Sequence, residues 1–259
     1  MAINKAKVLT ITSVRGGTGK TTTALNLAGL LSLKKEKTLL IDLDLYESAI
    51  GPLLNIQNEE NIYTLASDML NGYTKPIMSY ITKYNSYIDC LLAPNDPRRA
   101  ASVYSKSIID IIEKYRPNYD YIIIDTNYFM NDINLNVLDA SDMILYVIDN
   151  DLVSLKAMRS IGNIYNDIEK TNYKILINKS INKYKEKFDN FDLNNIIGNK
   201  INYILPSNFY QKNMGEYIKK GQILLLDNNI RKSNNKTLET FKNIINDLDK
   251  EVLKIEKIN

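Results

Sequence analysis

A glycine-rich stretch near the start of the chain, residues 15–22 (RGGTGKTT), has the residue types and spacing that bind phosphate. It follows an apolar run at 8–14 and precedes a helical pattern over 22–33. Glycines let the backbone turn so that successive N–H groups face inward, and the helix adds the positive end of its dipole. Lys20 can reach the β- and γ-phosphates of a nucleotide, and the Thr21 hydroxyl can ligate Mg²⁺. The context favours a phosphate-binding loop over a simple glycine turn before an ordinary helix.

Aspartates stand at or near the ends of two further apolar runs. Residues 38–45 (TLLIDLDL) are predicted to form a buried strand carrying Asp42 and Asp44, and residues 121–125 (YIIID) another that ends in Asp125. Alternation puts Asp42 and Asp44 on one side of their strand, next to the glycine-rich loop if the two strands are neighbours. Ligands in open α/β sheets bind at the carboxyl ends of strands, where a carboxylate can hold the water shell of Mg²⁺. A single aspartate at a strand end is also a common turn or cap, so the prediction depends on the three features together.

Strands that alternate with helices must position these groups. The pattern predicts an α/β fold, a doubly wound, mostly parallel sheet with helices on both faces. Further strands are predicted at 87–93, 143–148, 173–178 and 201–206, and further helices at 61–70, 105–115, 152–169 and 237–257. The Asn-Asn pairs at 194–195, 228–229 and 234–235 predict loops. We find no linker or repeat, so residues 1–259 are predicted to form one domain.

Composition excludes several classes of chemistry. The 259 residues include no histidine, which rules out histidine-based catalysis and histidine metal sites, and one cysteine, Cys90, which rules out an internal disulfide. We expect Cys90 to be a small buried hydrophobic residue. No apolar run approaches the ~20 residues of a membrane span, and no apolar signal segment opens the chain. We therefore expect a cytoplasmic protein without a membrane partner.

The net charge of +3 is unevenly distributed. Residues 173–236 contain 12 basic and 5 acidic side chains. A basic region of this kind could meet nucleic acid or an acidic membrane surface. The alternative is an ordinary solvated surface in a lysine-rich protein.

Residues 15–22 resemble the deviant Walker A box of the ParA/MinD ATPases, with the form [KR]-G-G-x-G-K-[ST]. Val14 stands where the standard form has its first glycine, and Arg15 stands in place of the family's signature lysine. Two later stretches match in order, so the resemblance covers most of the chain. It implies a P-loop, Mg²⁺-dependent ATPase that binds ATP through the loop residues Gly16, Gly17, Thr18, Gly19, Lys20, Thr21 and Thr22.

The two aspartate runs resemble the other boxes of this family. Residues 40–44 (LIDLD) are similar to its switch I box, but Leu45-Tyr46 replace the usual Pro-Gln. Residues 119–126 (YDYIIIDT) closely resemble its Walker B segment, with Asn127-Tyr128 in place of the usual Pro-Pro. The resemblance implies that Asp44 orients the attacking water, and that the metal is supported by Thr21, Asp42 and Asp125.

Two positions late in the chain are similar to the family's adenine-binding residues. Asn178 ends the KILIN run, and Pro206 follows Tyr203-Ile204-Leu205. An amide has both the donor and the acceptor that the edge of adenine requires. The alternative for Asn178 is a strand-end cap in an asparagine-rich chain.

Arg15 is the departure with the largest consequence. In the family the signature lysine crosses a nucleotide-sandwich dimer to the partner's phosphates. A guanidinium is always charged and can grip phosphate with two hydrogen bonds, so the resemblance implies a catalytic role in trans for Arg15, beside Lys20 and Asp44. The alternative is that Arg15 pairs locally and that dimerisation is weak.

The resemblance leads to three hypotheses. The first is a nucleoid-associated, ParA-like ATPase for plasmid or chromosome segregation, with an ATP-dependent homodimer, non-specific DNA binding and a ParB-type partner that stimulates hydrolysis. Its candidate DNA contacts are Lys183, Lys185, Lys187, Lys212, Lys219, Lys220, Arg231 and Lys232. The second is a MinD-like membrane-cycling ATPase, although the polar face of the helix at 237–257 mixes acidic residues with its lysines. The third is a degenerate nucleotide-binding scaffold.

Overall fold

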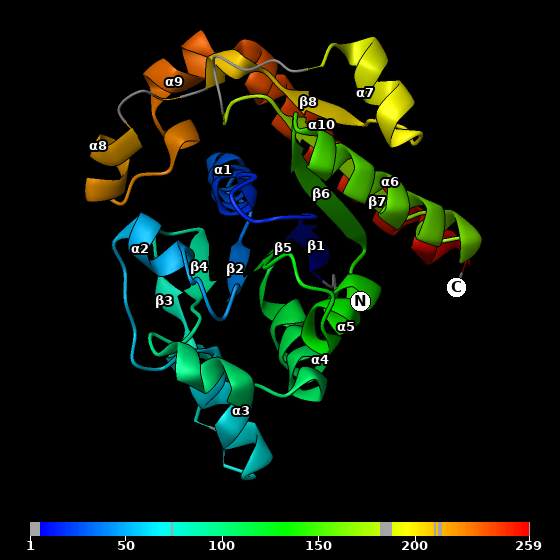
Figure 1. Cartoon of the computed structure of the whole chain (residues 1–259). Helices are drawn as coiled ribbons and strands as arrows, with labels where there is room; N and C mark the ends of the chain where they lie inside the picture. Colours follow the sequence, from blue (N-terminus) through cyan, green and yellow to red (C-terminus); the bar gives the residue numbers. More distant parts are fainter. Residues whose placement is uncertain (1–5, 74, 182–187, 210, 212–213, 259) are drawn as a thin grey trace.

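A single eight-stranded sheet carries the phosphate loop and both aspartate runs (Figure 1). The computed structural model describes the chain except residues 1–5, 74, 182–187, 210, 212–213 and 259, and the side chains of 254–258. The strand order is β3-β4-β2-β5-β1-β6-β7-β8, and every neighbouring pair is parallel except β3 with β4. The strands are β1 (Lys7–Thr12), β2 (Thr38–Leu43), β3 (Thr82–Lys83), β4 (Ile88–Leu91), β5 (Tyr121–Thr126), β6 (Met143–Asp149), β7 (Tyr173–Asn178) and β8 (Tyr203–Leu205).

Helices cover both faces of this sheet, which confirms the predicted fold class. They are α1 (Lys20–Leu33), α2 (Ile50–Leu54), α3 (Ile62–Leu70), α4 (Ser105–Tyr115), α5 (Asp132–Ala140), α6 (Leu152–Asp167), α7 (Asn190–Ile197), α8 (Met214–Lys219), α9 (Asn228–Ser233) and α10 (Asn235–Ile258). Short 3₁₀ turns include η2 (Pro97–Ser102), η4 (Ser207–Phe209) and η5 (Leu224–Leu226).

The central strands are apolar on both sides because each side meets a helix layer. Along β2, Leu40 packs into the core beneath α1 and α10, whereas Leu39 and Ile41 pack into the core beneath α3 and α4. This alternation is the period-two geometry of a strand. All six residues of β2 and of β5 are buried, which fixes the register of the two strands that carry the aspartates.

Two of the three predicted loops are corrected by the structure. The pair 194–195 lies inside α7, and the pair 228–229 begins α9. Aspartate side chains cap both helices, because Asp189 and Asp227 accept hydrogen bonds from backbone N–H groups of the first turn. The third pair, 234–235, forms the junction between α9 and α10.

Gly221, which follows α8, lies so close to α2 that a substitution can test how the two helices pack. Its φ is 58°, and an added Cβ would lie 2.1 Å from the backbone oxygen of Leu54. We expect Gly221→Ala to lower the free energy of unfolding by about 3 kcal/mol, because a left-handed backbone and a backbone clash combine. Gly72→Ala is the matched control, since Gly72 has a φ of 69° with open space around it, and should lose only about 1 kcal/mol. Urea unfolding measures both, and equal losses would contradict the predicted clash.

Candidate functional site

The glycine-rich loop lies between the end of β1 and the start of α1 and has the geometry of an anion nest. Gly17 and Gly19 have φ values of 75° and 91°, which side chains disfavour. Among the described residues no side chain caps α1, and its first turn carries no acidic residue. The N–H groups and the positive dipole end of α1 are therefore directed at the loop, where an anion would bind. Lys20, only 7% exposed, stands at the first position of the helix.

Thr21 and Asp125 connect the loop to β5. The Thr21 hydroxyl donates to Asp125 Oδ2 at 2.5 Å, and the carboxylate is fully buried. The other oxygen, Oδ1, is buried and has no hydrogen-bond partner among the described residues. A buried carboxylate oxygen without a partner is costly, and a cation or its bound water would satisfy it.

Asp42 lies beside Asp125, in register on the neighbouring strand β2. Its oxygens accept hydrogen bonds from Ser48 Oγ at 3.0 Å and from the backbone N–H groups of Ile50 and Asp44, both at 3.1 Å. Asp42 therefore anchors residues 44–50, the switch I segment. Asp42 therefore lies next to the same buried carboxylate to which Thr21 donates its hydrogen bond.

The two buried carboxylates lie side by side, and the charge of Lys20 compensates them only in part. Burial, and then the charge of Asp42, raise the pKa of Asp125 to about 8, while the Thr21 hydrogen bond and Lys20 act in the other direction. Burial also raises the pKa of Asp42 to about 6, with its hydrogen bonds opposing the rise. No group of three or more acidic or cysteine side chains clusters as a metal cage among the described residues. Mg²⁺ needs none, because it binds through one or two carboxylates together with water and phosphate oxygens, so these residues fit Mg²⁺.

Asp44 follows β2 at the edge of the site and is half-buried. Its pKa is raised by desolvation and lowered by the charge of Lys20, so the two side chains interact electrostatically. The sequence predicts that Asp42 and Asp44 lie beside the glycine-rich loop on the condition that β1 and β2 are neighbours. The strand order puts β5 between β1 and β2, so this condition is not met. Asp125, near the end of β5, contacts the loop through Thr21. Asp44, which follows β2, interacts electrostatically with Lys20 of the loop.

Arg15 lies on the outer side of the loop with 46% of its side chain exposed. Its guanidinium is 3.4 Å from Asp151 Oδ1 and 3.9 Å from Asp149 Oδ2. In the single chain, Arg15 thus makes the local pairing that the sequence left open as an alternative.

A hollow of about 160 Å³ adjoins the loop on the side of β7 and is lined by Gly19, Thr22, Asn178, Ser180 and Phe209, among others. Asn178 Nδ2 donates to the Thr18 carbonyl at 3.0 Å, and Asn178 Oδ1 accepts from Ser180. Pro206 accepts a hydrogen bond from Phe209 N at 3.1 Å and so starts the turn that brings the Phe209 ring to this hollow.

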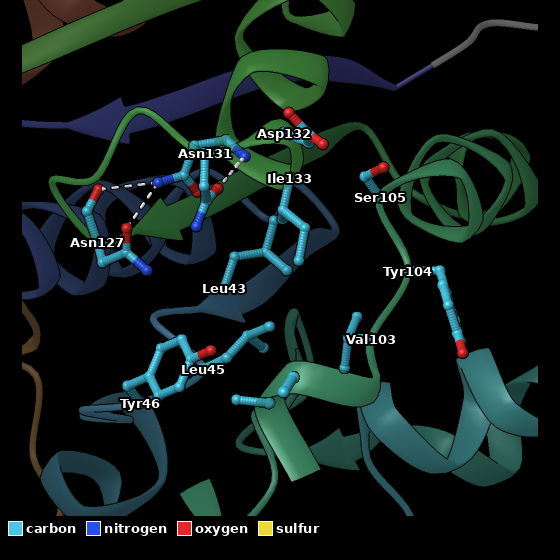
Figure 2. Close-up of a pocket in the computed structure, with 13 residues that line it drawn as sticks. Leu43, Leu45, Tyr46, Val103, Tyr104, Ser105, Asn127, Asn131, Asp132 and Ile133 are labelled. Atoms are coloured by element: carbon cyan, nitrogen blue, oxygen red, sulfur yellow. Dashed lines mark hydrogen bonds between the residues drawn. The ribbon is translucent and has the colours of Figure 1, made fainter. Parts of the chain in front are cut away.

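An asparagine network that the sequence did not reveal braces residues 127–131, the switch II segment (Figure 2). Asn134 Nδ2 donates to Asn127 Oδ1 at 2.7 Å and to the Phe129 carbonyl at 2.6 Å, and the Asn131 side chain accepts from Asn134 N. The available signal was Asn131, a good N-cap, ahead of the apolar spacing of α5. These bonds act where the family has two prolines.

A second hollow of about 330 Å³ separates the two switch segments (Figure 2). Leu43, Leu45 and Tyr46 line it from the switch I side, and Asn127 and Asn131 from the switch II side. Both segments directly follow the strands that end near Asp42 and Asp125, so movement of either segment changes the lining of this hollow.

The candidate DNA contacts are only partly visible. Lys183, Lys185, Lys187 and Lys212 lie outside the described residues. Lys219, Lys220 and Lys232 are exposed at α8 and α9. Arg231 donates to the Leu225 carbonyl at 2.6 Å and to Asn228 Oδ1 at 3.4 Å, so part of its donor capacity holds α9 against η5.

Comparisons with known proteins agree with this geometry. A family model described as "AAA domain" matches residues 6–183. Chromosome partitioning protein ParA of Myxococcus xanthus is 29% identical over 159 residues, 59% of this chain and 55% of the relative. Septum site-determining protein MinD of Thermotoga maritima is 30% identical over 166 residues, 61% and 58% of the two chains. The matches thus span little more than half the length of these relatives.

Solved structures resemble the chain over almost its whole length. A ParA family ATPase from Chlorobium tepidum has a TM-score of 0.75 at 18% identity, covering 95% of this chain and 98% of that one. MinD from Pyrococcus horikoshii complexed with Mg-ADP has a TM-score of 0.73 at 18% identity, covering 98% of each. At these identities the likeness is one of fold.

The two buried aspartates should respond oppositely to amide substitution. The raised pKa of Asp125 means that its ionised form opposes folding at neutral pH, so Asp125→Asn should raise the free energy of unfolding by about 1 kcal/mol or more. Asp42→Asn should lower it by about 1–3 kcal/mol, because one of its accepting oxygens becomes an N–H donor that faces other donors, and this loss exceeds the relief from its less strongly raised pKa. Urea unfolding at neutral pH, without Mg²⁺ or nucleotide, measures both. A similar loss in both variants would show that Asp125 acts mainly as a structural acceptor.

Proposed function

This chain belongs to the ParA/MinD family of P-loop ATPases, and we propose that it is a ParA-like ATPase of DNA segregation. In this proposal ATP closes a homodimer, the dimer binds DNA without sequence preference, and a DNA-bound partner of ParB type stimulates hydrolysis and release. The observation that carries the ATPase part is the hydrogen bond from Thr21 to the buried carboxylate of Asp125, which joins the phosphate loop to the end of β5.

The residues of the site divide the work of phosphoryl transfer among them. Backbone N–H groups of the loop and Lys20 bind the phosphates, as their placement at the start of α1 favours. Thr21, Asp125 and Asp42 would hold Mg²⁺ or its water shell, and the metal would neutralise charge on the β- and γ-phosphate oxygens. Asp44, half-buried and within the field of Lys20, orients the attacking water.

Arg15 completes the proposed site from the other protomer. It is half-exposed, and its two carboxylate partners hold it at distances of 3.4 and 3.9 Å, which are loose for an ion pair. An exposed, loosely held guanidinium can exchange these partners for the phosphates of a second copy. There it would neutralise the charge that develops in the transition state.

The C-terminal helix α10 supports DNA rather than a membrane as the surface that the dimer binds. Its apolar face is buried over 241–248, with Phe241, Ile244, Ile245 and Leu248 no more than 1% exposed, whereas Leu253 is 56% exposed. The part of the helix that packs in the core has no apolar face left to insert into lipid.

Acidic side chains of α10 are also tied to the sheet. Asp249 accepts from Lys7 Nζ and from the Tyr121 hydroxyl, both at 2.8 Å, and Asp247 accepts from the Tyr203 hydroxyl at 2.6 Å. Among the described residues, no helix combines the length and apolar composition that crossing a membrane requires. Membrane cycling is the second candidate, because MinD is as similar in sequence as ParA.

Gel shifts with no nucleotide, ADP, ATP and a slowly hydrolysed ATP analogue test the proposal. We expect DNA binding only with ATP or its analogue. Neutralising about six phosphates would make the affinity fall about 10³-fold between about 50 and about 200 mM salt. Binding that ignores nucleotide or salt would contradict a nucleotide-gated, charge-driven DNA surface.

Two controls sharpen this experiment. The double variant Lys219→Ala/Lys220→Ala should weaken DNA binding and reduce the salt slope. Lys250→Ala, at an exposed position of α10, should do neither. Co-sedimentation with anionic vesicles under the same nucleotide conditions tests the second candidate. ATP-dependent vesicle binding without DNA binding would replace the segregation role by membrane cycling.

Arg15→Ala should abolish ATP-dependent dimerisation in sedimentation velocity and lower ATP hydrolysis about 10³-fold, the effect of losing an arginine finger. Asp151→Asn is the matched control. It weakens the local ion pair, and an asparagine can still accept from Val153 N at the start of α6. It should leave dimerisation intact. If Asp151→Asn reproduces the defects of Arg15→Ala, or Arg15→Ala behaves like the parent, the trans role is wrong.

A further inference from the structure

Asn178 holds the phosphate loop by its side-chain amide. Nδ2 donates to the Thr18 carbonyl at 3.0 Å, and Oδ1 accepts from Ser180 N at 3.0 Å and from Ser180 Oγ at 2.7 Å. The side chain is 5% exposed. Resting on the proposed nucleotide-binding function, we propose that Asn178 is a positioning residue for phosphate.

The orientation of this amide follows from its partners. The Thr18 carbonyl can only accept a hydrogen bond, and Ser180 N can only donate one, so Nδ2 must face Thr18 and Oδ1 must face Ser180. Both lone pairs of Oδ1 are then occupied. An adenine amino group needs an acceptor, which Oδ1 does not offer while both Ser180 groups donate to it, and only the second Nδ2 hydrogen is then left for contact with a base.

The bond to Thr18 determines where a backbone donor of the loop points. The Thr18–Gly19 peptide is planar and trans, so its C=O and N–H point in opposite directions. Asn178 holds the carbonyl oxygen toward β7. It thereby directs the Gly19 N–H away from β7, toward the side of the loop on which the N–H groups would gather around an anion.

Gly19 and Asn178 also fit one another sterically. A Cβ at Gly19 would lie 2.5 Å from Asn178 Nδ2, well inside van der Waals contact, and the φ of Gly19 is 91°. The glycine therefore serves both the left-handed turn and the close approach of the amide. Asn178 ends β7 in register with Asp149 of β6, so the hydrogen bond is built on a rigid strand of the sheet.

The test compares ligands that share phosphates but differ in the base. Calorimetry of Mg-ATP, Mg-GTP and Mg-tripolyphosphate, which has no base, is run on the parent, Asn178→Ala and Asn178→Asp. We expect Asn178→Ala to weaken all three ligands by the same factor of about tenfold, with the ATP-to-GTP ratio unchanged, because a charge-neutral positioning bond is lost. Asn178→Asp should lose more, because a carboxylate oxygen would face the Thr18 carbonyl. Loss of ATP affinity alone, with tripolyphosphate unaffected, would overturn the proposal.

A milder variant and a spectroscopic signal guard against misfolding. Ser180→Ala removes one of the two bonds to Oδ1 and should give the same base-independent pattern with a smaller, few-fold loss. In ¹⁵N-labelled parent protein, the Gly19 amide resonance should shift when saturating tripolyphosphate is added. In folded Asn178→Ala this shift should be reduced, and an unchanged shift would count against the brace.

The parent protein separates this inference from the function on which it rests. A parent that binds none of the three ligands would refute nucleotide binding itself. A parent that binds them, combined with a base-selective defect in Asn178→Ala, would leave the ATPase proposal standing and overturn only the positioning role.

Discussion

The burial of two carboxylates at the ends of adjacent strands is the constraint on which this molecule depends. Asp42 and Asp125 are both fully buried and in register, and desolvation is the largest cause of the raised pKa of each. Such a pair is tolerated only where hydrogen bonds and positive charge surround it. Thr21, Lys20 and the backbone of the switch I segment provide that surrounding, so the phosphate loop and switch I are joined through the aspartates.

The two switch segments are held by hydrogen bonds where proline would fix the chain covalently. Proline locks φ and removes an N–H, so a proline turn keeps its shape whatever lies beside it. The hydrogen bonds of Asn127, Asn131 and Asn134 hold the turn only while their partners stay in place. The apolar and aromatic side chains of Tyr128 and Phe129 remain exposed on this turn. The departure from the family pattern thus changes how the switch is held while the carboxylates beneath it stay in place.

The sequence predicted the parts of the site that local pattern determines. Apolar runs located β1, β2 and β5, and glycine spacing located the loop, because strand burial and left-handed turns leave a direct signature. The prediction failed where a capping side chain starts a helix in a segment whose composition is typical of a loop. Asp189 and Asp227 cap helices in such asparagine-rich segments. Strand order could not be predicted, because no local pattern says that β5 lies between β1 and β2. The contact of Asn178 with Thr18 could not be predicted either, because the two residues are 160 positions apart in the chain.

The phosphate loop is fixed by two hydrogen bonds to the ends of strands, whereas its outer edge at Arg15 is held only loosely. Asp125 holds it through Thr21, and Asn178 holds it through the Thr18 carbonyl, both from strand ends that the sheet makes rigid. Arg15, at the outer edge, is half-exposed and pairs loosely with the carboxylates of Asp149 and Asp151. Rigid inner contacts fix the donors that must match phosphate geometry, since a displaced donor contributes little. A loosely held cation at the edge can change partner without disturbing that geometry.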